Sequence, residues 1–150
     1  MAFPIMKLAA ALMFACPSPV PVAPAGTALL QSGEIRFHTI DEAKDGDTVV
    51  TVTVRDRRGQ TIALLTGVLG RWAEDAWSAL IPLNVTSPPG DLARLWGGTI
   101  NVRIDPEGDD TWAFTFHTYL HFSDGQTADV HQRQLAVVNE DRRDWTTIIR

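Results

Sequence analysis

The sequence predicts an all-β fold, an antiparallel β-sandwich of about eight strands, and three observations lead to this prediction. Apolar and polar residues alternate in stretches such as residues 48–56 (TVVTVTVRD) and 98–105 (GTINVRID). This period of two is typical of strands with one buried face. Turn-forming sequences separate the stretches at short intervals. Only residues 91–96 (DLARLW) indicate a helical turn, with Asp91 as its cap.

Each strand is expected where an alternating stretch ends at a turn signal. The expected strands lie near residues 35–40, 48–56, 61–69, 78–84, 98–105, 112–122, 127–138 and 145–150. The clearest turn signals lie at residues 56–59 (DRRG), 87–90 (SPPG), 105–108 (DPEG) and 123–125 (SDG). We therefore expect residues 27–150 to form one sandwich domain.

The stretch at residues 108–125 (GDDTWAFTFHTYLHFSDG) alternates most clearly. Its even-numbered positions carry most of the aromatic residues and predict a strand face that lines the core. The odd-numbered positions carry His117, Tyr119 and His121, which we expect to face outward.

A hairpin is predicted at residues 123–125, because Gly125 can adopt a positive φ there. We expect a three-residue loop with Ser123 opposite Thr127. The strand pairs that follow from this register are Leu120 with Val130, His121 with Asp129, and Tyr119 with His131.

The composition limits the classes of function. The chain has 150 residues, a formal net charge of -5 and 45% hydrophobic residues, which is ordinary for one globular domain. An acidic chain without a basic stripe is not expected to bind nucleic acid. No apolar run after the leader approaches the roughly 20 residues of a membrane helix, so no transmembrane segment is expected in the mature protein.

Residues 1–26 resemble a signal peptide or lipoprotein leader, because one Lys precedes a short apolar run and a Pro-rich tract. We expect either cleavage after Ala25 or lipid attachment at Cys16, the only Cys, with the Pro-rich tract as a tether. The predicted location is secreted or periplasmic, or lipid-anchored through Cys16. The protein is cytoplasmic if the leader is not a signal.

Acidic residues are expected to gather at one end of the sandwich. Antiparallel strands alternate in direction, which places the loops at residues 41–47, 70–77, 105–110 and 139–144 together, and most of the chain's 18 acidic residues lie in them. Crowded carboxylates need solvent or a cation, and Ca²⁺ accepts about six to eight oxygen ligands in irregular geometry. The predicted Ca²⁺ ligands are Asp45, Asp47, Asp105, Asp109 and Asp110. Alternatively, these acids cap turns and keep strand edges soluble without a metal.

Two other groups of side chains have two interpretations each. Trp72 and Trp77 lie in the same group of loops, where they form an interface with a membrane or ligand if exposed, or close the end of the sandwich if buried. On the outward face, His121, Asp129 and His131 bind Zn²⁺ if they converge across the hairpin, and otherwise form a solvated polar surface.

The sequence contains no Gly-x-Ser-x-Gly, His-Glu-x-x-His or phosphate-loop motif. A non-enzymatic protein is therefore predicted. A small hydrolase that uses Asp109 for acid/base chemistry is the alternative.

Three segments carry a resemblance to a known family: residues 46–54 (GDTVVTVTV), 97–104 (GGTINVRI) and 109–112 (DDTW). They resemble the PLAT (lipoxygenase-homology) type of β-sandwich, in particular small stand-alone bacterial domains. The resemblance implies an eight-stranded sandwich whose end loops bind Ca²⁺ and dock on lipid or on a partner protein. It also implies that Asp47 and Asp110 contribute oxygen ligands.

Together, these features predict an exported, non-enzymatic binding module. We expect it to dock through its acidic end on a lipid surface, a glycan or another protein, with Ca²⁺ bridging to an anionic headgroup. The alternative is a structural or adhesive sandwich that uses a sheet edge, or the face of Tyr119, His121 and His131, without a metal.

Overall fold

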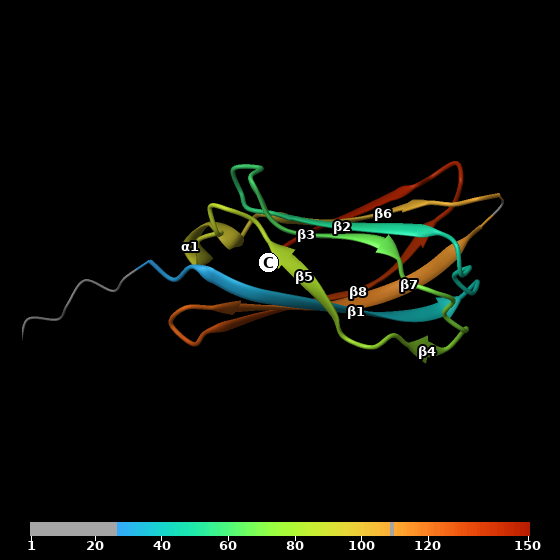
Figure 1. Ribbon diagram of the computed structural model, residues 1–150, viewed down its shortest axis with the longest axis horizontal. Helices are drawn as coiled ribbons and strands as arrows, with labels where there is room; N and C mark the ends of the chain where they lie inside the picture. Colours follow the sequence, from blue (N-terminus) through green and yellow to red (C-terminus); the bar gives the residue numbers. More distant parts are fainter. Residues whose placement is uncertain (1–26, 109) are drawn as a thin grey trace, which may run out of the picture.

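The computed structural model describes residues 27–108 and 110–150, which form a nearly all-β, antiparallel structure (Figure 1). The predicted fold class is confirmed. The predicted leader at residues 1–26, including Cys16, lies outside the described residues, and so does Asp109. In the described part of the chain, no helix has the length and hydropathy needed to cross a membrane.

The strands lie close to the expected positions. Their bounds are β1 Leu30–Asp41, β2 Val49–Arg55, β3 Thr61–Val68, β4 Ala76–Trp77, β5 Ile81–Val85, β6 Thr99–Asp105, β7 Trp112–Phe122, β8 Thr127–Val138 and β9 Asp144–Ile148. The short helix α1 spans Leu92–Leu95, and the Asp91 side chain caps it by accepting a hydrogen bond from the amide of Ala93 at 2.9 Å. Only β4, a two-residue strand, was not expected as a separate element.

The strands follow the order β8-β7-β1-β5-β3-β2-β6-β9, with β4 beside β1, and this order folds into two facing layers (Figure 1). β5 belongs to both layers, because Ile81 pairs with Ile35 of β1 while Val85 pairs with Ala63 of β3. β8 and β9 end the order and have no strand partner on their outer edges among the described residues. The structure is therefore a sandwich that is joined at β5 and open between β8 and β9.

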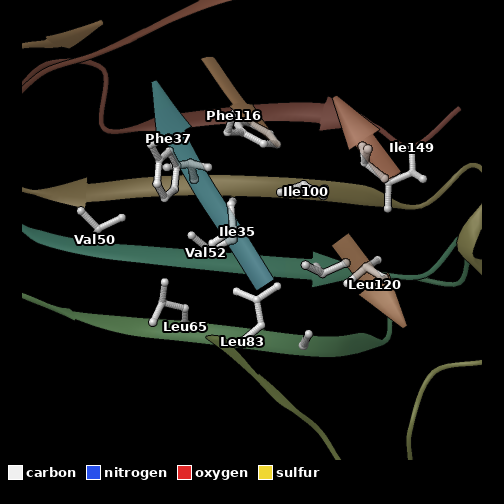
Figure 2. Close-up of a cluster of buried hydrophobic side chains, with 14 of the residues drawn as sticks. Ile35, Phe37, Val50, Val52, Leu65, Leu83, Ile100, Phe116, Leu120 and Ile149 are labelled. Carbon is white, nitrogen blue, oxygen red and sulfur yellow. The ribbon is translucent and has the colours of Figure 1, made fainter. Parts of the chain in front are cut away.

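The core lies between the two layers and follows the predicted alternation. Figure 2 shows side chains of both layers that meet there, and Ile35, Phe37, Val52, Ile100 and Leu120 are among those with no measurable exposure. Burying a large apolar side chain stabilises a fold by about 1.5–3 kcal/mol relative to leaving it exposed. This packing makes the outer faces of the strands rigid supports for polar side chains.

The predicted register of the hairpin between β7 and β8 is wrong by two residues. Leu120 lies opposite Ala128 rather than Val130, and His117, not Tyr119, lies opposite His131. The physical reason is the turn: the loop consists of residues 123–125, and the Phe122 amide donates to the Gln126 carbonyl at 2.9 Å. Gly125 adopts a φ of 83°, as this loop requires.

A two-residue shift keeps every side chain on its predicted face, because side chains alternate with a period of two. It changes the neighbours across the strands, and it brings two histidines together on the outer surface.

Candidate functional site

The acidic loops gather at one end of the sandwich as predicted, on the right in Figure 1. Three contacts join them: a backbone bridge between Lys44 and Trp72, a hydrogen bond from Thr48 to Asp110, and an ion pair of Arg143 with Asp105. This end contains two separate electrostatic arrangements.

The first arrangement surrounds Lys44, whose side chain is fully buried. Its Nζ donates to the carbonyl oxygens of Asp45 and Gly70, at 2.8 Å for Gly70, and lies 5.4 Å from the ring centroid of Trp72. Burial lowers the pKa of Lys44, while the charges of Asp110, Asp47 and Asp45 oppose this shift. The Lys44 ammonium is therefore a cation inside the group of carboxylates predicted to hold Ca²⁺.

Two of the predicted Ca²⁺ ligands, Asp110 and Asp105, already have partners within the protein. Asp110 is only 6% exposed and accepts a hydrogen bond from the Thr48 hydroxyl. The second arrangement surrounds Asp105, which forms ion pairs with Arg103 at 2.8 Å and with Arg143 at 3.4 Å. The hydrogen bond from Arg103 lowers the pKa of Asp105, and Arg143 lowers it further.

The carboxylates predicted as Ca²⁺ ligands do not fit a Ca²⁺ site. An ammonium lies among three of the carboxylates, and two guanidinium groups bind a fourth. Across residues 27–108 and 110–150, no group of three or more His, Cys, Asp or Glu residues is placed to hold a metal ion. The Ca²⁺ assignment stays a prediction, and its fifth residue, Asp109, lies outside the described residues.

The two tryptophans predicted as an interface lie in different environments. Trp72 is half-buried and packs against the core, with its ring centroid 5.3 Å from Phe37 and 5.2 Å from Trp112. It closes the end of the sandwich, as the alternative interpretation expected. Trp77, in contrast, is 45% exposed and lies opposite His38 of β1, on the outer side of the sheet.

Local backbone contacts hold Trp77 in place. Asp75 adopts a left-handed conformation with a φ of 50°, which turns the chain into β4. Ser78, which follows Trp77, forms two hydrogen bonds with β1. Its amide donates to the Phe37 carbonyl at 2.8 Å, and the Phe37 amide donates to the Ser78 hydroxyl at 3.0 Å.

Trp77 lies beside a group of outward-facing side chains that we name the histidine face. Its members are Arg36 and His38 of β1, Trp77 of β4, His117 and Tyr119 of β7, and Asp129 and His131 of β8. The strand register puts Arg36, His117 and His131 in one row across three strands.

The rings and the guanidinium group of the histidine face are in close contact. The ring of His38 stacks on Trp77 with centroids 4.7 Å apart, and Cζ of Arg36 lies 4.6 Å from the Trp77 ring centroid. His117 meets Trp77 edge-on at 5.5 Å, and its ring centroid lies 3.5 Å from that of His131. The face is thus a continuous platform of planar groups.

The charges on the histidine face are incompletely paired. His38 lies 3.3 Å from a carboxylate oxygen of Asp75, and His117 lies 3.7 Å from one of Asp129. Burial lowers the pKa of His117, as do His131 and Arg36, while Asp129 raises it. Arg36 has no ion-pair partner among the described residues, and its buried Nε has no acceptor.

The Zn²⁺ set of His121, Asp129 and His131 does not form in the described structure. His121 lies opposite Thr127 and contacts its hydroxyl at 3.0 Å. The pairing of His117 with His131 was not predicted from the sequence. The signal that could have found it is Gly125 as the last residue of the loop, which sets the observed register.

A cleft of about 430 Å³ lies between the open edges of β8 and β9. Polar side chains dominate its lining, which consists of Asp129, Val130, His131, Gln132, Gln134, Thr146, Thr147, Ile148 and Arg150. It shares Asp129 and His131 with the histidine face, so the two surfaces are continuous.

The comparisons with known proteins do not assign the chain to a family. No protein-family model matches the chain, and no curated protein matches it either. The resemblance to PLAT domains therefore stays a prediction.

Proposed function

We propose that the chain is a non-enzymatic binding module for carbohydrate, and that the histidine face receives the sugar. The position of Trp77 carries this proposal. The residue is 45% exposed, and β4 holds it on the outer side of β1, beside Arg36 and His38 rather than in the core.

The chemistry of the histidine face suits a sugar. The apolar C–H groups of a sugar ring pack on aromatic rings, and its hydroxyl groups need polar side chains as hydrogen-bond partners. Trp77 and Tyr119 supply rings, while Arg36, Asp129 and His131 supply donors and acceptors. Paired strands hold these groups in place before a ligand arrives, which reduces the entropy lost on binding.

The cleft between β8 and β9 supports a ligand longer than one sugar unit. Gln134, Thr146 and Thr147 line it with groups that both donate and accept hydrogen bonds, and it begins where the histidine face ends. A glycan chain that packs on Trp77 would continue across His131 into the cleft. Export, which the leader predicts, would bring this surface to envelope or extracellular glycans.

Docking on lipid through the acidic end has less support. Its exposed carboxylates repel anionic headgroups unless a cation bridges them, and Lys44 already lies among the predicted ligands of that cation. Trp72, which that mechanism needs at the surface, packs against Phe37 and Trp112.

The test is binding of the labelled full chain to an array of immobilised neutral and acidic oligosaccharides. We expect binding to at least one class of glycan, and we expect Trp77→Ala to abolish it. Trp96→Ala is the matched control, because Trp96 is 47% exposed and follows α1 at the opposite end of the sandwich (Figure 1). Absence of any bound glycan, or equal loss in both variants, overturns the proposal.

A further inference from the structure

We infer that the glycan is acidic, and that its carboxylate or sulfate group binds the row formed by Arg36, His117 and His131, more tightly as the pH falls. The inference rests on the proposed function and adds the charge of the ligand and the regulation of its binding. The only permanent charge in that row is the guanidinium group of Arg36.

The charged guanidinium group of Arg36 has no carboxylate as an ion-pair partner among the described residues. Other half-buried arginines of the chain are paired, for example Arg103 with Asp105 at 2.8 Å and Arg94 with Asp91 at 3.9 Å. Arg36 instead contacts the rings of Trp77 and Tyr119, with its Cζ 4.6 Å and 6.0 Å from their centroids. A guanidinium held between two rings presents its planar donors in a fixed orientation, which suits a carboxylate or sulfate group.

His131 adds a second donor to the row. The Nε of Arg133 lies 3.3 Å from Nδ1 of His131, and a guanidinium nitrogen can only donate, so Nδ1 accepts. The proton of neutral His131 is therefore on Nε2, which has no hydrogen-bond partner within the described structure. This N–H is available to an anionic oxygen.

His117 makes the row sensitive to pH. The charged and titratable groups around it are Arg36 of β1, Tyr119 of β7 itself, and Asp129, His131 and Arg133 of β8. Without a ligand, burial and the neighbouring cations lower the pKa of His117, and Asp129 only partly opposes them. A bound anion stabilises the protonated ring, so binding takes up a proton.

Linkage gives the sign and the limit of this effect. Because the complex binds more protons than the free protein, affinity rises as the pH falls through the histidine range. Each proton taken up raises affinity by at most about tenfold per pH unit. Uptake of one proton by His117 therefore sets the upper limit of the effect.

The experiment measures calorimetric binding of the full chain to oligogalacturonate and to its methyl ester, an uncharged analogue of the same length. Both are titrated at about pH 5.5 and about pH 7.5, on either side of the ordinary histidine pKa of about 6.5. A heparin oligosaccharide serves as the sulfated probe. We expect an acidic probe to bind at least several-fold more tightly at the lower pH, and the methyl ester to bind weakly at both.

Two variants assign the effect to the row. Arg36→Gln is expected to weaken binding of the acidic probe at both pH values, and His117→Gln to remove most of the pH dependence. Arg94→Gln is the matched control, because Arg94 is also half-buried but lies in α1 at the other end of the domain. Thermal unfolding of each variant separates lost binding from lost folding.

The outcomes separate this inference from the proposed function. If the methyl ester binds as tightly as the acid, or if only neutral glycans bind on the array, the inference is overturned and the carbohydrate function stands. If neither these probes nor the array yields a bound glycan, the proposed function is overturned as well.

Discussion

Replacing Lys44 with Met tests whether the acidic end is stabilised by its own ammonium group. The substitution keeps a long apolar side chain in the buried position and removes the charge that lies among Asp45, Asp47 and Asp110. It therefore separates the electrostatic contribution of Lys44 from its packing.

The magnitude follows from the carbonyl oxygens of Asp45 and Gly70, which lose a charged donor, and from Asp110, which is only 6% exposed and loses a nearby cation. Leaving a buried polar group without its partner costs about 1–3 kcal/mol. The hydrogen bond from Thr48 remains and reduces the penalty, and Asp45 and Asp47 are solvated. We expect Lys44→Met to lower the free energy of unfolding by about 2–4 kcal/mol, which corresponds to roughly 10 °C in Tm for a domain of this size.

The assay is urea unfolding followed by tryptophan fluorescence, at constant pH and salt. Asp47→Asn is the control, since Asp47 is exposed, and we expect it to change stability by less than about 0.5 kcal/mol. The double variant Lys44→Met with Asp110→Asn should be more stable than Lys44→Met alone, because no buried carboxylate is left without a cation. A loss below about 0.5 kcal/mol for Lys44→Met would refute this reasoning.

Three further predictions follow from the same structure. The wild-type Tm should be equal in EDTA and in millimolar Ca²⁺, because Lys44 lies among the candidate ligands; a rise of several degrees with Ca²⁺ would instead show that the acidic loops bind it. The lowered pKa of His117 means that the unfolded chain binds more protons, so the free energy of unfolding should fall as the pH drops below about 6.5. In His117→Gln, urea unfolding at several pH values should show a free energy of unfolding that depends less on pH. Gly98→Ala should destabilise the fold by several kcal/mol, about the scale of severe overpacking, because the added Cβ would lie 2.2 Å from the Arg55 carbonyl. Gly67→Ala, whose Cβ would meet its nearest atom at 3.9 Å, should be nearly neutral in the same thermal unfolding assay.

The layers and faces of the sandwich could be predicted because they depend on side-chain alternation alone. Val50, Val52 and Val54 are fully buried, as their period of two indicates. The gathering of the acidic loops also followed, since it requires only that successive strands run antiparallel. Neither inference needs to know which residue of one strand faces which residue of the next.

The histidine face could not be predicted because it depends on register and on a long-range contact. A shift of two residues leaves the faces unchanged, so alternation could not choose between His117 and Tyr119 as the neighbour of His131. Trp77 reaches the face through β4, which is too short to produce a periodic signal. Lys44 was missed for a related reason: a single lysine in an acidic loop gives no sign that its side chain is buried.

The position of β5 determines how the two layers can move relative to each other. Among the described residues, strand pairing continues from one layer into the other only on this side, through the pairs of β5 with β1 and β3. Opposite β5, the edges of β8 and β9 are unpaired within the described chain, so thermal separation of the layers should concentrate there. A glycan in the cleft would contact both edges at once and oppose that separation, which makes the breathing motion of the domain a physical readout of occupancy.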